Sequence, residues 1–159
     1  ALCYYLAQRP GDMMALTHNN FDASVTEVVF RQQKTGKKMT LPVLPELAKY
    51  VKAAFAEYGG RTYTKGPRMF NIEFREIKTL AGLPQNLQIR DLRRTALVEF
   101  MERGATDAEG QSWSGHSNRD MLNTYAPATK KMAINAMQKR FVNEKLNLYK
   151  KVLALPQKV

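Results

Sequence analysis

The sequence has almost no cysteine and no long apolar run. Cys3 is the only cysteine, so an internal disulfide and a cysteine-rich zinc site are both excluded. No apolar run approaches the roughly 20 residues of a membrane span, and the first residues lack the charged and then apolar layout of a signal peptide. A glycine-rich loop of the Walker type and an acidic cluster suited to Mg²⁺ are also missing. We therefore expect a reduced, cytoplasmic setting, with neither metal nor nucleotide called for.

Acidic residues are scarce relative to basic ones. The 159 residues include 25 Lys and Arg against 14 Asp and Glu, which gives a formal net charge of +11. An excess of this sign favours a polyanionic partner, with nucleic acid ahead of a membrane surface. The alternative is a basic protein whose charge serves only solubility.

The length suits one domain with a real core, and we predict a single domain over residues 1–159. The opening stretch "ALCYYLAQRP" has no Met and is typical of the middle of a helix, so we expect a domain excised from a longer chain. The last part, residues 128–159, is predicted to form one or two basic amphipathic helices. These helices would pack either on a neighbouring protomer or back on their own domain.

Apolar spacing and turn residues predict a mainly α fold with a small antiparallel β-sheet. Arg9 stands at the entrance of a short helix, "PGDMMALT", that "HNN" would end. A β-hairpin is expected over Val25–Leu44, with Gly36 in its turn and Lys34 at its bend. Helices are predicted from Pro45 to a Gly-Gly pair, over Asn71–Ala81, over Leu87–Arg103, and from a Thr106/Glu109 capping box towards Trp113.

The helix bearing "QIRDLRRTALVEF" carries three arginines at close spacing. Arg93 and Arg94 lie three and four positions after Arg90, so all three can share one flank. Like charges this close repel each other unless an anion lies between them. A solvated basic face is the ordinary alternative for such a cluster.

The stretch "GHSNRDMLNTYAP" places His116 and Tyr125 nine positions apart. On one unbroken helix they would point to opposite faces, because nine residues rotate a side chain by about 900°. Gly115 can end the preceding helix, and Ser117 or Asn118 can cap a new one, so a break would let both side chains face one site. Taken alone, each is more typical of a core or satisfied polar residue.

In their order along the chain, these segments resemble the catalytic domain of the tyrosine recombinase (phage integrase) family, over roughly Leu6 to Pro127. "AQRPGDMMALTHNNFD" is similar to the family's first arginine box, with Arg9 as its arginine and Asp12 at its acidic position. "QQKTGKKMTLPV" is similar to the hairpin that carries the family's lysine, which would be Lys34.

The two remaining boxes follow. "IRDLRRT" is similar to the family's His-x-x-Arg box, which makes Arg93 the second arginine. "WSGHSNRDMLNTY" is similar to the Gly-His-Ser segment and its nucleophilic tyrosine, which would be His116 and Tyr125.

The resemblance implies cleavage of a DNA strand by Tyr125, through a 3′-phosphotyrosyl link that conserves the energy of the phosphodiester. It therefore implies no ATP, metal or other cofactor, and no small-molecule substrate. The partner would be double-stranded DNA, with self-association into a tetramer in the recombination complex and no membrane. Further candidates for contacts to the DNA backbone are Lys37, Lys38 and Arg119.

Arg90 departs from the family pattern, because the family usually has His at this position. Arginine stays protonated near neutral pH and cannot accept a proton, so Arg90 cannot serve as a general base. Either activity is reduced, or the phenol proton leaves by another route, to water or to neutral His116. Two alternatives stay open: a DNA-binding module of the same fold without turnover, and the related chemistry of type IB topoisomerases or hairpin-forming resolvases. The compact arrangement and the Gly-His-Ser box favour a recombinase.

Overall fold

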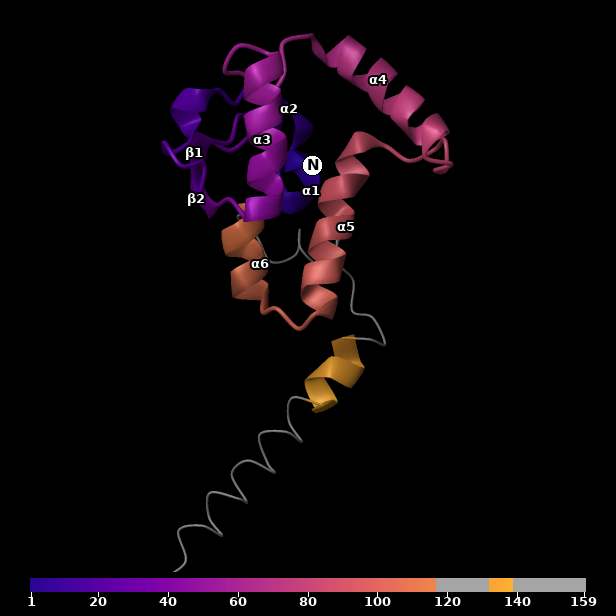
Figure 1. Ribbon diagram of the computed structural model, residues 1–159. Helices are drawn as coiled ribbons and strands as arrows, with labels where there is room; N and C mark the ends of the chain where they lie inside the picture. Colours follow the sequence, from indigo (N-terminus) through magenta and orange to yellow (C-terminus); the bar gives the residue numbers. More distant parts are fainter. Residues whose placement is uncertain (117–131, 139–159) are drawn as a thin grey trace, which may run out of the picture.

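The computed structural model describes residues 1–116 and 132–138. It is mainly helical with one two-stranded antiparallel sheet, as predicted (Figure 1). In chain order the elements are α1 (Leu2–Tyr5), α2 (Pro10–Met14), the 3₁₀ helix η1 (His18–Asn20), β1 (Glu27–Arg31), β2 (Lys38–Pro42), α3 (Pro45–Glu57), α4 (Pro67–Leu80), α5 (Ile89–Glu102) and α6 (Asp107–Ser114). Residues 132–138 are also helical.

The predicted hairpin is confirmed and forms one wall of the core. Val28 pairs with Leu41 and Phe30 with Met39, and all four side chains are buried. Their neighbours along the strands face outward, as the two-residue period of a strand requires. Gly36 closes the turn with a φ of 67°, in the left-handed region where glycine costs little.

Helix boundaries follow local capping. The helix expected over Asn71–Ala81 begins four residues earlier, because Pro67 supplies the fixed φ of a first helical residue after Gly66. The helix predicted after Pro10 ends at Met14 rather than at "HNN". Those three residues instead form η1, because Thr17 and Asn20 cap its first turn reciprocally, and the Asn20 side chain accepts from the Thr17 N–H at 2.9 Å.

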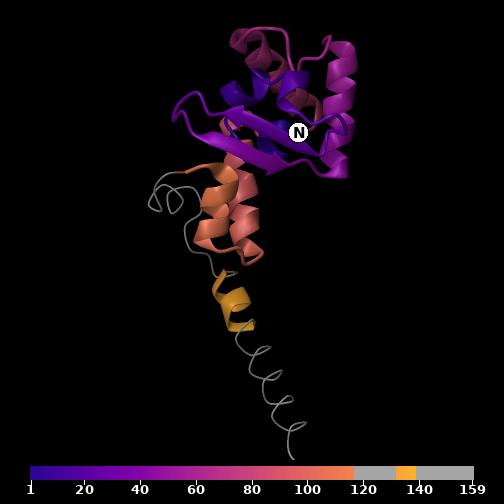
Figure 2. The same ribbon diagram turned by 90° about the vertical axis from the view of Figure 1, so that its left-hand side faces the viewer.

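Helix α5 packs against α1 and α6, and α1 packs against α2. α5 and α6 lie side by side and antiparallel, below the hairpin in both views (Figures 1 and 2). α3 lies alongside the hairpin (Figures 1 and 2). The main core joins residues of α1, α2, the hairpin and α3, among them Leu6, Val28 and Leu47. A smaller cluster of Ala7, Ala96 and Leu97 fixes the segment after α1 against α5. This second contact brings the first arginine box to the helix that carries the second arginine.

Within the described ranges, no helix is both long enough and apolar enough to cross a membrane.

Candidate phosphate-binding site

Arg9 lies at the start of α2, as predicted. Its backbone is extended, with φ −69° and ψ 145°, and Pro10 follows as the first helical residue. Arg9 is half-buried, and its Nη1 atom is buried without a hydrogen-bond partner among the described residues. A buried donor of this kind normally has an acceptor, so the atom is available to a bound anion.

Arg93 lies on the buried side of α5. It is 4 % exposed, whereas Arg90 and Arg94 are exposed. The three arginines therefore do not share one environment, although their spacing brings them near one another along the helix. Arg93 directs its Nη2 to the His116 Nε2 atom at 2.6 Å.

His116 follows directly after the end of α6. The predicted capping box begins this helix, with the Thr106 hydroxyl accepting from the Glu109 N–H. The helix ends at Gly115, whose φ is 75°, as the sequence predicted. The turn leaves His116 only 3 % exposed.

Ser114 determines which nitrogen of His116 carries the proton. Its hydroxyl donates to the Gly110 carbonyl at 2.6 Å, so it has no second hydrogen to give. The His116 Nδ1 atom, 2.8 Å from the same hydroxyl, must therefore be the protonated donor. Nε2 is then the acceptor, which matches the guanidinium that faces it.

The surroundings of His116 are cationic. Burial, followed by the charges of Arg93, Arg9 and Lys37, lowers the pKa of His116 from 6.5 to about 4. The imidazole is therefore neutral at pH 7. Three cations from α2, the hairpin and α5 act on one buried ring, and an anion placed among them would be stabilised by all three.

The hairpin turn is tied to the first arginine box. The Asp12 carboxylate accepts from the Gln33 N–H at 2.8 Å, and the Gln33 side chain donates to the Gly11 carbonyl at 3.3 Å. Lys34, the next residue, is exposed and makes no hydrogen bond or ion pair with the part of the chain that the structure describes. The turn therefore carries Lys34 beside α2, with its ammonium group unpaired within residues 1–116 and 132–138.

The remaining predicted site residues have different positions. Tyr125 and Arg119 lie outside the described residues. Lys37 and Lys38 are exposed at the end of the turn and the start of β2. Of the predicted set, Arg93 contacts His116, and the charges of Arg9 and Lys37 act on the same ring.

Three polar residues at the site were not singled out by the sequence: Gln8, Gln32 and Ser114. Each is 1 % exposed or less. For Gln32 a signal exists, because it continues the inward-facing alternation of Val28 and Phe30. A polar residue at an inward position of a strand is expected to have an internal hydrogen-bond partner.

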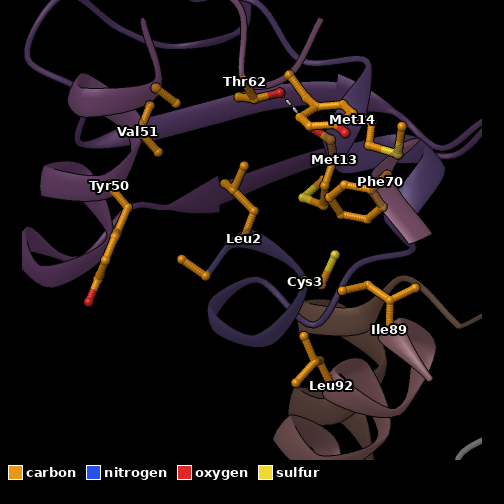
Figure 3. A pocket seen from close by; sticks show the side chains of 13 residues that line it. Leu2, Cys3, Met13, Met14, Tyr50, Val51, Thr62, Phe70, Ile89 and Leu92 are labelled. Carbon is orange, nitrogen blue, oxygen red and sulfur yellow. Dashed lines mark hydrogen bonds between the residues drawn. The ribbon is translucent and has the colours of Figure 1, made fainter. Parts of the chain in front are cut away.

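An apolar cavity of about 210 Å³ lies elsewhere in the molecule (Figure 3). Its walls come from α1 to α5 and from the segment between α3 and α4, and Cys3, Met13 and Leu92 point into it. The cationic residues around His116 do not line it. Within residues 1–116 and 132–138, no group of three or more His, Cys, Asp or Glu side chains is arranged to hold a metal ion.

The chain belongs to the phage integrase family, whose family model matches residues 1–132. Its fold is similar to the crystal structure of XerA recombinase, with a TM-score of 0.71 and 14 % identity over 87 % of this chain and 54 % of that one. It is also similar to the Tn1549 transposon integrase in complex with transposon right end DNA, with a TM-score of 0.62 and 16 % identity over 87 % and 56 % of the two chains.

The catalytic domain of bacteriophage HP1 integrase is a third structural relative, with a TM-score of 0.58 and 22 % identity over 84 % of this chain and 76 % of that one. At these identities the likeness is one of fold. The chain spans about half the length of the XerA and Tn1549 proteins. Comparison with curated protein sequences gives no significant match.

Proposed function

We propose that this chain is the catalytic domain of a site-specific DNA recombinase or integrase. It would cut and rejoin a DNA strand through a 3′-phosphotyrosyl intermediate on Tyr125. The observation that carries the proposal is the buried Arg93–His116 pair. The charge of Arg9 also acts on His116, and the buried Arg9 Nη1 atom has no hydrogen-bond partner among the described residues. This is the environment that a scissile phosphate requires.

The arginines suit the charge that develops in the reaction. A phosphodiester is already anionic and gains charge on its non-bridging oxygens as a nucleophile attacks. Arg9 and Arg93 would hold these oxygens with forked N–H donors and neutralise the added charge. Neighbouring cations also favour the phenolate of Tyr125, whose ordinary pKa is about 10.

The route of the phenol proton is open to His116 because Arg90 cannot accept a proton. With a pKa of about 4, neutral His116 is a weak base in the DNA-free protein. A bound phosphate would offset the three neighbouring cations and so raise the pKa of His116. The phenol proton of Tyr125 would then pass to His116 or to a water beside it. Nε2, the nitrogen that can take a proton, faces Arg93, so Arg93 would have to turn its Nη2 from Nε2 to the phosphate before the transfer. The protonated Nε2 would then donate a hydrogen bond to the same phosphate. Exposed Arg90 would contribute only its positive charge.

Lys34 is proposed as the general acid. As the phenol oxygen bonds to phosphorus, the bond to the 5′-oxygen breaks, and the Lys34 ammonium would give that oxygen a proton. The exposed turn lets Lys34 reach a bound DNA strand, and the Gln33–Asp12 bond keeps the turn next to Arg9. Attack on the phosphotyrosine by a 5′-hydroxyl of another strand then restores the phosphodiester and releases Tyr125.

Double-stranded DNA is the proposed partner. The net charge of +11 supports it, and the Tn1549 relative is a DNA complex. Lys37, Lys38 and Arg119 would contact the backbone, so affinity would fall steeply with salt. We further propose that residues 1–159 act as one cytoplasmic catalytic domain, and that this domain assembles as a tetramer on DNA. Residues 128–159 would pack on a neighbouring protomer. Neither metal nor ATP would take part in the reaction.

Trapping on nicked DNA tests the proposal. The probe is a library of duplex oligonucleotides with a random central segment and one nick, so that cleavage near the nick releases a short fragment and leaves the protein attached. We expect an adduct that survives denaturation in EDTA without nucleotide, and that is absent from the Tyr125→Phe variant. The measurement is the fraction of protein shifted on a denaturing gel.

Binding without covalent attachment would contradict this function. If the chain retains the library in a salt-sensitive manner but forms no adduct, it is a DNA-binding module of the same fold. An adduct of equal yield in Tyr125→Phe would exclude Tyr125 as the nucleophile.

A further inference from the structure

Two glutamine side chains meet in the interior beside the proposed phosphate site. Gln8 is 0 % exposed and Gln32 is 1 % exposed. The Gln32 amide donates to the Gln8 side-chain oxygen at 2.7 Å. Burying an amide costs free energy unless its hydrogen bonds are satisfied, so both side chains are expected to have internal partners.

Every amide hydrogen of the pair has an acceptor. Gln8 Nε2 donates to the Leu6 carbonyl at 3.0 Å and to the Trp113 carbonyl at 2.8 Å. Gln32 Nε2 donates to Gln8 and to the Ser114 carbonyl at 3.0 Å, while Gln32 Oε1 accepts from the Thr35 hydroxyl at 2.7 Å. Flipping either amide would place an oxygen against carbonyl oxygens, so only one orientation satisfies the network.

The partners of the pair come from the three segments that carry the site. Gln8 directly precedes Arg9, and Gln32 lies two residues before Lys34. The Trp113 and Ser114 carbonyls belong to the last turn of α6, just before Gly115 and His116. The pair therefore fixes the start of α2, the hairpin turn and the His116 segment to one another.

Gly115 permits this close approach. A Cβ atom there would lie 2.5 Å from Gln32 Nε2 and 2.8 Å from Met39 Sδ. Both distances are shorter than real Cβ contacts, so the two side chains would have to shift, and Gln32 Nε2 would then lose its hydrogen bonds to Gln8 and to the Ser114 carbonyl. The last turn of α6 thus rests directly on the glutamine bridge, and His116 follows at the next position.

We propose that Gln8 and Gln32 form a positioning bridge that holds Arg9, the hairpin turn and His116 in the geometry of one phosphate site. This inference rests on the proposed function for its catalytic consequence but not for its effect on His116. An apolar pair of the same size would also fill the space, but it would not fix the orientation of the three segments relative to one another. Hydrogen bonds to particular carbonyl groups fix that orientation.

The test replaces the amides with a side chain of similar length. Gln8→Met and Gln32→Met keep volume but remove the hydrogen bonds, and the double variant tests whether the two act as a unit. Val51→Ala is the matched control, because Val51 is a 1 % exposed core residue of α3 and has no part in the hydrogen bonds of the bridge. If Gln32→Met does not fold, Thr35→Val removes one bond from the exposed side, with Thr35→Ser as its hydroxyl-retaining control.

Two measurements are made on each variant. The first is the pKa of His116, measured by NMR titration without DNA. This pKa depends on how deeply the ring is buried and on how close the neighbouring cations lie. We expect both Met variants to move the midpoint from its low value towards 6.5, and Val51→Ala to leave it unchanged. The second is the trapping rate on the nicked library, which should fall by about 10- to 100-fold at nearly unchanged DNA retention. The double variant should be no worse than the poorer single variant, because one bridge is lost in each.

The proposal is overturned if the Met variants titrate His116 as the wild type does, or if Val51→Ala shifts it equally. It is also overturned if the wild type forms adduct and the Met variants form it at the wild-type rate. If the wild type itself forms no adduct, the proposed function fails, and the titration alone decides whether the bridge positions His116.

Discussion

His116 shows how a residue can be recognisable in the sequence while its chemical state is not. The spacing to Tyr125 and the preceding Gly115 identify it as a candidate, but neither reveals a neutral imidazole held between a guanidinium and a serine hydroxyl. The neutral state follows from burial and from three neighbouring cations, which belong to residues far apart in the chain. The weak base of the free protein is a consequence of the same charges that would bind the phosphate.

We predict that His116 titrates with a midpoint near 4 and that sulfate raises it, because an anion among Arg93, Arg9 and Lys37 offsets their repulsion of the imidazolium. The chain has two histidines, so the His18→Asn variant leaves one signal to follow by NMR. A midpoint at or above 6.5, or one that does not move with sulfate, would contradict the account of the site.

The same pKa predicts the pH dependence of stability. Unfolded His116 has the ordinary value of 6.5, and the folded value is about 4, so between these pH values the unfolded state binds more protons. The contribution of this group to the free energy of unfolding is therefore complete above pH 6.5 and is lost as the pH falls towards 4. Urea unfolding across this range should show the decline, and the His116→Gln variant should show less of it.

At the scale of elements, periodicity and turn residues were sufficient for much of the fold. The hairpin, α3, α5 and the α6 capping box follow from patterns within about 20 residues. The start of α4 was missed because Pro67 and Gly66 outweigh the apolar spacing from which that helix was predicted. The glutamine bridge was missed for another reason. Whether a polar side chain faces inward depends on partners from distant segments, and only the strand register of Gln32 hinted at it.

The contact between α6 and the hairpin gives a prediction for glycine. Gly115 and Gly36 both have a positive φ, at 75° and 67°, but a Cβ at Gly36 would meet nothing within 4 Å. Gly36→Ala should therefore lose only about 1 kcal/mol from backbone strain. Gly115→Ala should lose roughly 2–5 kcal/mol, because the Gln32 amide must move away from the new Cβ and give up its hydrogen bonds, a cost that adds to the backbone strain. Urea unfolding followed by circular dichroism measures both, and equal losses would mean that α6 does not rest on Gln32.

At the scale of the whole molecule, the basic charge and the order of the boxes predicted both family and architecture. Arg9 and Arg93 are 84 positions apart in sequence, yet both act on His116. The small cluster of Ala7, Ala96 and Leu97 explains how: it packs the residues before Arg9 against the helix of Arg93. The central claim is that this convergence forms one phosphate site for attack by Tyr125.

The chemical linkage of the trapped adduct tests that claim most directly. Adducts from the nicked library are digested with nuclease and protease, and mass spectrometry locates the remaining nucleotide. We predict a nucleotide joined through its 3′-phosphate to Tyr125, with the yield reduced by about 10²-fold or more in Arg9→Ala and Arg93→Ala. A nucleotide on another residue, a link through a 5′-phosphate, or an undiminished yield in both arginine variants would contradict it.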